Sequence, residues 1–498
     1  MKRLGIGASI GLALAAALAF GACPLLPVFN APTGNLLFGR SYGPPPESAY
    51  GTRIRVPEGL SIGLYAADLP NARILRFTPA GDLLVSLPRS GRVMLLSRDA
   101  DGDGRADGAR VLLEGLNRPH GLDLHEGWLY VAETDAVGRI RFDASRGETG
   151  GGFERVVTGL PAGGNHWTRT LRFGPDGWLY VSVGSSCNVC EEEDPRRAAL
   201  LRFRPDGSGG EIHATGLRNA VGFDWRPETG ELFATDNGRD LLGDDFPPCE
   251  LDRIVPGGFY GWPYANGPNV PDPDLGAGHE ARIRQALPPV HAFAAHNAPL
   301  GITFVRGERA PAAYRGAALV ALHGSWNRRR KDGYEVVSLH WLADGRIEER
   351  ALVTGFLLDD EVIGRPVDVA EGPDGAFYVS DDYAGAVYRV AAGTGPAAAL
   401  PIARPRAASP AAPLPAAERE RLDAAGRALY ESHACARCHE AAAAEPGVVP
   451  VPLRGLASRY AEGELESYLA APTPPMPAFP LSDEERRALA LHLLARYP

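Results

Sequence analysis

A pattern of paired short strands recurs six times along most of this 498-residue chain. Each copy has a strand, a turn rich in glycine, proline and aspartate, and a second strand that a glycine precedes. Most intervals between these glycines are about 50 residues. Repeats of this length, each a small antiparallel sheet, predict a mainly β fold, a six-bladed β-propeller over residues 59–393. The leading glycines are Gly81, Gly127, Gly177, Gly230, Gly316 and Gly375.

Two further features refine the propeller prediction. Residues 60–66 have the character of a strand and precede the first repeat, so we expect them to complete the last blade and close the ring. The interval after the fourth repeat is the longest, and residues 236–297 form a loop-rich insert. Because long loops on a rigid scaffold commonly carry functional sites, we expect this insert to contribute to one.

Residues 435–439 form a CxxCH signature for covalent haem attachment. Cys435 and Cys438 would bond the haem vinyl groups, and His439 would be one axial ligand of the iron. Of the three methionines, only Met476 lies nearby, and a thioether opposite a histidine is typical of cytochromes c. A zinc site would need further cysteine or histidine ligands at suitable spacing. The signature therefore predicts haem c and a role in electron transfer.

The segment around this signature is predicted to be a separate domain. Residues 394–416 are mostly alanine and proline, which indicates a semi-rigid linker. Ser482 with Glu485 makes a capping box for a C-terminal helix. Residues 417–498 resemble a small all-α class I cytochrome c domain.

The N-terminal residues have a secretory pattern. Lys2 and Arg3 precede an apolar run up to residue 22, which predicts a signal peptide over residues 1–22. Cys23 follows small residues, so lipoprotein processing there would leave a lipid anchor in the membrane. Ordinary cleavage nearby and an uncleaved helical anchor are the alternatives. All three place the rest of the chain in the periplasm, and we interpret residues 23–58 as an N-terminal extension.

Charge and cysteine usage narrow the partners further. The net charge of −10 disfavours nucleic acid and anionic membrane surfaces. Beyond the haem and lipid candidates, three cysteines remain, and an oxidising compartment favours a disulfide among them with the pairing left open. A thioredoxin-type redox role for the CxxC pair lacks the βαβ context that it needs. These cysteines are Cys187, Cys190 and Cys249.

Several polar residues lie where they could carry chemistry. His166 precedes the third repeat, and imidazole suits proton abstraction at neutral pH, although most of the twelve histidines must be structural. Arg218 and Asn219 open the fourth repeat in the same topological place, and this pair suits a planar, oxygen-rich anion. The loop 236–239 could offer oxygen ligands to calcium or be a solvated acidic loop.

A second acidic loop has a clearer calcium pattern. Its aspartates alternate with a glycine at the turn, and Arg110 stands where an EF-hand would place its last glutamate. We therefore expect a structural calcium loop outside the catalytic site. Its candidate ligands are Asp99, Asp101, Asp103 and Asp107.

Together these stretches carry a family resemblance. Residues 59–393 resemble the PQQ-dependent soluble aldose dehydrogenases, and within them the L-sorbosone dehydrogenase-like branch. The combination of motifs, rather than any one of them, is specific. The stretches are 166–177, 216–219, 230–239, 257–263, 296–301 and 365–375.

The resemblance implies roles for individual residues. His166 matches the general base that removes a hydroxyl proton from the sugar, while Arg218 and Asn219 match residues that contact pyrroloquinoline quinone (PQQ). Gly238 and Arg239 match positions whose backbone carbonyls bind the active-site calcium. Other cofactor-lining positions are matched by His120, Asn237, His296 and Arg365.

The chain also departs from the better-known glucose enzymes. They have Gln-Gly-Pro where this chain has Asn237-Gly238-Arg239, and they place a lysine near the cofactor's carboxylates. No lysine matches here, and Arg328 is the candidate substitute. These differences leave the sugar specificity open.

Three functions are consistent with the sequence. The first is a quinoprotein dehydrogenase that oxidises a sugar or hydroxyaldehyde and passes electrons to its own haem, then to a downstream cytochrome or oxidase. The second is a calcium-dependent, lactonase-like hydrolase, and the third is a non-catalytic propeller that docks the cytochrome. Hydrolysis needs no electron acceptor, and docking alone gives His166 and Arg218 no purpose, so the first is favoured.

Overall fold

The computed structural model describes residues 30, 40–393, 416–440, 443, 453, 456, 460, 462–470, 472, 476 and 479–497. These residues belong to two compact units, a strand-rich one and a C-terminal helical one, and each is described by itself. The predictions for the signal peptide, for Cys23 and for linker residues 394–415 lie outside the described residues. No helix among the described residues is long and apolar enough to cross a membrane.

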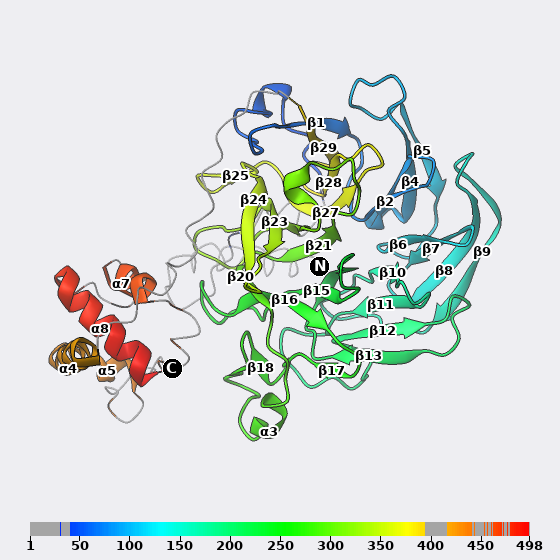
Figure 1. Cartoon of the computed structure of the whole chain (residues 1–498). Helices are drawn as coiled ribbons and strands as arrows, with labels where there is room; N and C mark the ends of the chain where they lie inside the picture. Colours follow the sequence, from blue (N-terminus) through cyan, green and yellow to red (C-terminus); the bar gives the residue numbers. More distant parts are fainter. Residues whose placement is uncertain are drawn as a thin grey trace, which may run out of the picture. The chain divides into compact units, whose positions relative to one another are not determined.

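Six antiparallel blades of four strands surround a common centre in the first unit (Figure 1). The predicted six-bladed propeller is therefore confirmed. The first three blades are β2 (Leu75–Phe77), β3 (Leu83–Leu87), β4 (Arg92–Ser97) and β5 (Gly108–Leu113); β6 (Leu122–His125), β7 (Trp128–Ala132), β8 (Ala136–Asp143) and β9 (Glu148–Thr158); and β10 (Leu171–Phe173), β11 (Leu179–Val183), β12 (Ala199–Phe203) and β13 (Glu211–Thr215).

The last three blades complete the ring. Strand β1 (Leu60–Ala66) pairs with β29 in the sixth blade, so the expected closure by residues 60–66 is confirmed. The strands are β14 (Ala220–Trp225), β15 (Leu232–Asp236), β16 (Pro248–Ile254) and β20 (His291–Ala295); β21 (Pro299–Phe304), β22 (Ala318–Leu322), β23 (Glu335–Trp341) and β24 (Ile347–Val353); and β27 (Pro366–Glu371), β28 (Phe377–Asp381) and β29 (Ala386–Ala392).

The repeated glycines have a local cause. Each lies in the turn between the first and second strand of its blade, and each has a positive φ, from 70° at Gly230 to 94° at Gly81. Side chains with a Cβ are strained in this region, so glycine is the residue that such turns need. The second strands that follow, such as β3 and β11, are buried along their whole length.

Buried aspartates tie neighbouring blades together. In three blades an aspartate on the first strand accepts a hydrogen bond from a backbone N–H on the first strand of another blade. A buried carboxylate is costly unless it is bonded in this way, so each pair fixes one blade against another. The pairs are Phe173 N to Asp123 at 2.8 Å, Phe304 N to Asp224 at 2.7 Å and Leu75 N to Asp368 at 2.9 Å.

The insert after β15 adds small elements to the propeller. Strand β17 (Gly258–Phe259) pairs in parallel with β13, and β20 forms the outer edge of the fourth blade. The remaining short elements are β18 (Ala265–Asn266), β19 (Val270–Pro271) and α3 (Glu280–Ile283), followed between the fifth and sixth blades by β25 (Leu357–Leu358) and β26 (Glu361–Val362).

The C-terminal unit is helical, as expected. It contains α4 (Ala416–Ser432), α5 (Ala436–His439), α7 (Glu462–Ala470) and α8 (Asp483–Arg496). Helices α4 and α7 both pack against α8, and the predicted capping box of Ser482 and Glu485 begins α8. At the α4–α8 crossing a Cβ on Gly426 would lie 2.1 Å from the carbonyl oxygen of Ala488, so only glycine permits this approach.

Candidate active site

A cavity of about 330 Å³ opens on the propeller where the loops that lead into the first strands converge. Loops that precede β2, β10, β14, β21 and β27 each contribute to its wall, so residues far apart in sequence meet there. Seven residues predicted from the sequence line it, namely His166, Arg218, Asn219, Asn237, Gly238, His296 and Arg365.

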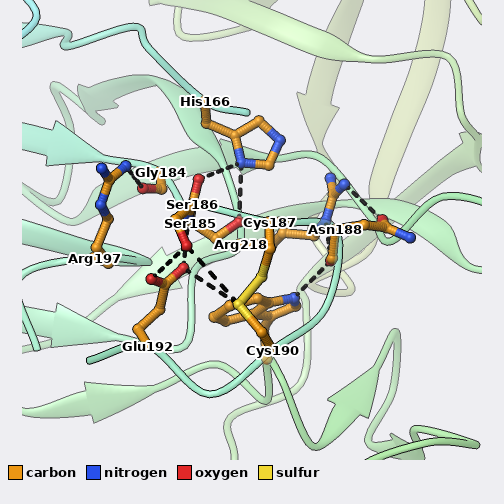
Figure 2. Close-up of a disulfide and its surroundings, with 11 residues drawn as sticks. His166, Gly184, Ser185, Ser186, Cys187, Asn188, Cys190, Glu192, Arg197 and Arg218 are labelled. Carbon is orange, nitrogen blue, oxygen red and sulfur yellow. Dashed lines mark hydrogen bonds between the residues drawn. A yellow bond between two sulfur atoms is a disulfide. The ribbon is translucent and has the colours of Figure 1, made fainter. Parts of the chain in front are cut away.

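His166 is held by one of its two ring nitrogens. Its Nδ1 lies 2.9 Å from the carbonyl oxygen of Ser185 and 2.9 Å from the Ser185 hydroxyl oxygen (Figure 2). The hydroxyl hydrogen is used elsewhere, since it is donated to the carbonyl oxygen of Cys187 at 2.7 Å. Both oxygens near Nδ1 must therefore accept, so Nδ1 carries the ring proton and Nε2 keeps a lone pair. That is the tautomer that a proton-accepting group needs.

The surroundings of His166 keep it uncharged. Burial, and then the positive charge of Arg218, lower its pKa to about 3. Arg197 and Arg169 act in the same direction, while the hydrogen bond to Ser185 opposes them. At neutral pH the imidazole is thus deprotonated and able to accept a proton.

Arg218 is anchored on all three guanidinium nitrogens. Nη1 donates to the carbonyl oxygens of Asn237 at 3.1 Å and Gly238 at 2.9 Å. Nη2 donates to Asn188 Oδ1 at 2.9 Å and pairs with Asp240 at 2.7 Å, and Nε donates to the Asn188 carbonyl at 3.0 Å. With so many acceptors around it, this buried guanidinium has one orientation.

A second network on the cavity wall joins the predicted Arg365 to side chains that the sequence reasoning missed. Arg365 Nη2 donates to His323 Nδ1 at 3.0 Å, and His323 Nε2 then donates to Asp382 at 3.1 Å. Arg73 pairs with the other oxygen of Asp382 at 2.8 Å. Burial would raise the pKa of Asp382, but His323 and the two arginines outweigh it and lower that pKa, so the carboxylate stays charged.

An aromatic and cationic face forms another part of the wall. The Arg118 guanidinium lies 3.9 Å from the centre of the Trp167 ring, and His120 meets the same indole edge-on at 5.7 Å. His120 itself is fully buried and is not among the cavity-lining residues. His120 therefore lies behind Trp167. His120 was expected to line the cavity, but Trp167 lines it instead.

The haem-binding candidates of the helical unit gather around one apolar cluster. Cys435 precedes the short helix α5, and Cys438 and His439 lie within it. Cys435 and Met476 both pack against a buried cluster that includes Leu465, while Cys435 and Cys438 form no disulfide. The thiols are therefore available, and the predicted sulfur ligand packs against the same core.

Comparison with known proteins identifies both units. Residues 128–389 match the family model described as glucose/sorbosone dehydrogenase, which covers more than half of the chain. The chain belongs to the glucose/sorbosone dehydrogenase family. Residues 421–493 match the model for cytochrome c oxidase, cbb3-type, subunit III, so this family member carries a C-terminal cytochrome c domain, as predicted.

Individual relatives are more distant. An uncharacterized protein of Borreliella burgdorferi is 36% identical over 43% of the chain and 56% of its own length. A pyrroloquinoline quinone-dependent pyranose dehydrogenase of Coprinopsis cinerea is 23% identical over 69% of the chain and 55% of its own length. The chain thus spans about half the length of the curated relatives it matches.

Solved structures share the propeller fold. The PQQ domain of the Coprinopsis cinerea pyranose dehydrogenase, in its holo form, has a TM-score of 0.59 at 22% identity and covers 70% of this chain and 98% of that domain. A calcium structure of a Trichoderma reesei AA12 enzyme has a TM-score of 0.59 at 23% identity, covering 71% and 98%. At such identities the agreement shows the fold of this family member.

Among the described residues of this family member, two acidic clusters have oxygens close enough to share a cation. Asp236, Glu250 and Asp252 are buried, and their carboxylate oxygens lie within 4.8 Å of one another. Neither oxygen of Asp252 accepts a hydrogen bond from the described residues. Burial, then mutual repulsion, raises the pKa values of Glu250 and Asp252 well above the ordinary range. The donor set therefore fits a hard cation such as calcium.

The second cluster is the predicted calcium loop. Oxygens of Asp99, Asp101 and Asp107 lie within 4.8 Å of one another, and this cluster is largely exposed. Asp103 is not part of this group, and its carboxylate accepts the backbone N–H of Arg105 at 2.8 Å. The loop thus brings three of the four predicted aspartates together.

The side chains of two predicted arginines form ion pairs away from the cavity, while the role predicted for Arg239 concerns its backbone carbonyl and stays a prediction. Arg239 forms ion pairs with Asp272, at 2.5 Å, and with Asp274. Arg328 pairs with Asp245 at 3.0 Å and donates to the Ala295 carbonyl. Neither side chain lines the cavity. Arg328 was expected near the cofactor, whereas the arginines that line the cavity include Arg73 and Arg118.

The structure shows which two of the three remaining cysteines form the disulfide. Cys187 and Cys190 are bonded to each other, and Cys249 is a buried free thiol at the cavity wall. Burial raises the pKa of the Cys249 thiol to about 11, so it is an inert part of the wall.

Proposed function

We propose that this protein is a periplasmic quinohaemoprotein dehydrogenase that oxidises an aldose or a related hydroxyaldehyde with PQQ and calcium. The observation that carries the proposal is His166, a neutral imidazole whose lone-pair nitrogen is left free by the bonds at Nδ1, in the wall of an arginine-rich cavity. A proton-accepting group beside a cationic pocket suits removal of a hydroxyl proton next to an anionic redox cofactor.

The charges of the cavity fit PQQ. PQQ is a planar quinone with three carboxylates. Among the described residues, the cavity wall has five arginines and two aspartates, which leaves three positive side-chain charges unbalanced. Trp167 offers a flat ring for stacking. The arginines are Arg73, Arg89, Arg118, Arg218 and Arg365.

Calcium has two candidate positions near this cavity. The carbonyl oxygen of Gly238 accepts a hydrogen bond from Arg218 in this structure, so calcium at that atom would share it with the guanidinium. The buried carboxyl groups of Asp236, Glu250 and Asp252 form the stronger donor set, because they offer three hard oxygen ligands within 4.8 Å of one another. Asp236 also accepts the backbone N–H of Asn219 at 2.5 Å, which links this cluster to the cavity wall.

His166, Ser185 and Arg218 have different roles in the proposed reaction. His166 Nε2 accepts the proton of the substrate hydroxyl, and Ser185 holds the ring so that this nitrogen faces the cavity. Arg218 places a fixed positive charge beside it, which stabilises negative charge as it develops on oxygen. PQQ, when bound, supplies the two-electron acceptor. The sugar specificity depends on loop residues around the same cavity.

The cytochrome domain provides the route out for electrons. Cys435 and Cys438 would bond the haem, with His439 and Met476 as axial ligands. Because one chain carries both units, transfer from propeller to haem would be intramolecular. A downstream cytochrome or oxidase would then accept the electrons, and lipid attachment at Cys23 would hold the protein at the membrane.

The decisive test is reduction of the haem by substrate. Purified protein receives PQQ, calcium and a panel of aldoses, and the haem absorption bands are followed. We expect reduction only when all three additions are present. A His166→Ala variant, with cofactor binding measured separately, should lose most of the reduction rate. Absence of haem reduction across a broad panel of sugars would refute the proposal.

A further inference from the structure

We propose that the Cys187–Cys190 disulfide is a positioning element that orients both His166 and Arg218, so that its reduction lowers turnover reversibly. The effect on turnover rests on the proposed function. The effect on side-chain orientation does not, and it can be measured in the protein without PQQ.

The disulfide loop holds His166 through Ser185. The loop between β11 and β12 carries Ser185 and the four-residue ring closed by the disulfide (Figure 2). Ser185 Oγ donates to the carbonyl oxygen of Cys187 at 2.7 Å and accepts from His166 Nδ1 at 2.9 Å. The backbone carbonyl of Cys187 therefore orients the Ser185 hydroxyl, and this hydroxyl in turn orients the His166 imidazole.

The same ring holds Arg218 through Asn188. Asn188 lies inside the ring, and both its carbonyl oxygen and its Oδ1 accept from the Arg218 guanidinium. Its side chain also bonds both backbone groups of Asp240, with Oδ1 at 2.8 Å from the N–H and Nδ2 at 3.0 Å from the carbonyl. Three of the contacts that orient the Arg218 guanidinium therefore depend on this loop. Two are made by Asn188 itself, and the third is made by Asp240, which Asn188 positions.

The disulfide is the covalent constraint on this loop. Residues 184–198 belong to no helix or strand, so the ladder of the blade does not fix the carbonyls of Cys187 and Asn188. A bond between residues three positions apart removes most of the conformations that this stretch would otherwise sample. Glu192 constrains the other side of the loop, because its carboxylate accepts hydrogen bonds from the backbone N–H and the hydroxyl of Ser186. Cleaving the disulfide would loosen the two carbonyls, while the Glu192 contacts and the hydrogen bond from Trp262 Nε1 to the Asn188 carbonyl at 3.2 Å remain.

Reduction is chemically simple and balanced. Both cysteines are half-buried, so a small dithiol such as dithiothreitol can reach them. A thiolate attacks one sulfur, the Cys187–Cys190 bond breaks, and the second thiolate of the reagent resolves the mixed disulfide. The protein gains two electrons and two protons as thiols, and the dithiol becomes its cyclic disulfide.

The first test needs no activity. Full-length protein containing haem but no PQQ is labelled with ¹⁵N-histidine, and the ring-nitrogen signals that disappear in a His166→Ala variant are assigned to His166. With the disulfide intact we expect a protonated Nδ1 and an unprotonated Nε2. After reduction by dithiothreitol and its removal, both shifts should move towards the average of two exchanging tautomers. His340 is the internal control, because its Nε2 bonds the Ser338 hydroxyl at 2.9 Å within the fifth blade, away from the loop.

The second test measures turnover. The reduced protein, freed of dithiothreitol, should show kcat at least about tenfold lower with a KM for sugar changed less than twofold, since small misplacements of catalytic groups cost large factors. Oxidised glutathione should restore kcat. The Cys187→Ser/Cys190→Ser double variant should be equally slow and insensitive to dithiothreitol.

The two tests separate the possible failures. Unchanged His166 shifts in protein whose two new thiols have been counted would overturn the positioning role, whether or not the protein oxidises sugars. Altered shifts without any sugar oxidation in either redox state would support the positioning role and refute the proposed function instead. Because the wild-type chain is reduced in its folded state, the test does not depend on the variants folding.

Discussion

The sharpest prediction concerns the charge of Asp382 in the second network of the cavity wall. Its side chain is 5% exposed and pairs with Arg73, which is 9% exposed. Changing Asp382→Asn keeps the shape but removes the negative charge that Arg73 and Arg365 face. Because breaking a buried pair leaves an uncompensated charge, we expect the free energy of unfolding to fall by about 3 kcal/mol, the lower end for such pairs.

A matched control uses the same substitution at the surface. Asp344 pairs with Arg346 at 2.7 Å, but these side chains are 51% and 57% exposed. Asp344→Asn should therefore leave the free energy of unfolding almost unchanged, because exposed ion pairs contribute little. The comparison isolates burial, since residue type, substitution and partner type are the same.

Urea unfolding can follow the propeller alone. All seven tryptophans lie between residues 128 and 341, so tryptophan fluorescence reports the propeller. The lowered pKa of Asp382 fixes the sign of the pH effect: its contribution to stability is present above the unfolded pKa and is lost as pH falls below it. The difference between wild type and Asp382→Asn should thus shrink in acid. A loss at neutral pH no larger than that of Asp344→Asn would refute the reasoning.

Three more predictions test other parts of the structure. Because the pKa of His166 is lowered to about 3, kcat/KM should show no acid limb near pH 6.5 from this residue, and a limb there that disappears in His166→Ala would contradict the assignment. Gly426→Ala should lower the melting temperature of the cytochrome domain, read from the haem absorption, because the new Cβ would lie 2.1 Å from the Ala488 carbonyl. Unchanged melting would show that the two helices can separate at no cost. Met476→Ala should lower the haem reduction potential measured by redox titration, and an unchanged potential would exclude Met476 as ligand.

The fold was largely predictable because its signal is local. The six turn glycines have positive φ, and this requirement of a single turn is visible in the sequence at each repeat. Strand β1 could be placed in the last blade because ring closure leaves one blade short of a strand. The bonds between blades were not predictable in the same way, since Asp224 and Phe304 are neighbours only after the ring has formed.

The candidate site was predictable only in part, for the same physical reason. His166 and Arg218 were found through short motifs, whereas Arg73, His323 and Asp382 belong to different blades and have no motif in common. The direction of a side chain was also beyond the sequence: Arg239 turns to Asp272, a partner in the insert. A pattern predicts which residues stand near a site, and the opposite charges around each residue decide which way it points.

The two networks of the cavity show how the direction of each arginine side chain affects the charge of the site. Carbonyl oxygens and one aspartate surround Arg218. Arg73 pairs directly with Asp382, and Arg365 is linked to the same carboxylate through His323. Positive charge is therefore fixed in place but only partly compensated, which is costly in the free protein and favourable once an anion binds. An anionic cofactor would then gain affinity from the same arginines that destabilise the free protein. The Asp382→Asn variant, with one negative charge fewer in the wall, should for this reason bind PQQ at least as tightly as wild type while unfolding more easily, and weaker binding measured by fluorescence quenching would contradict this account.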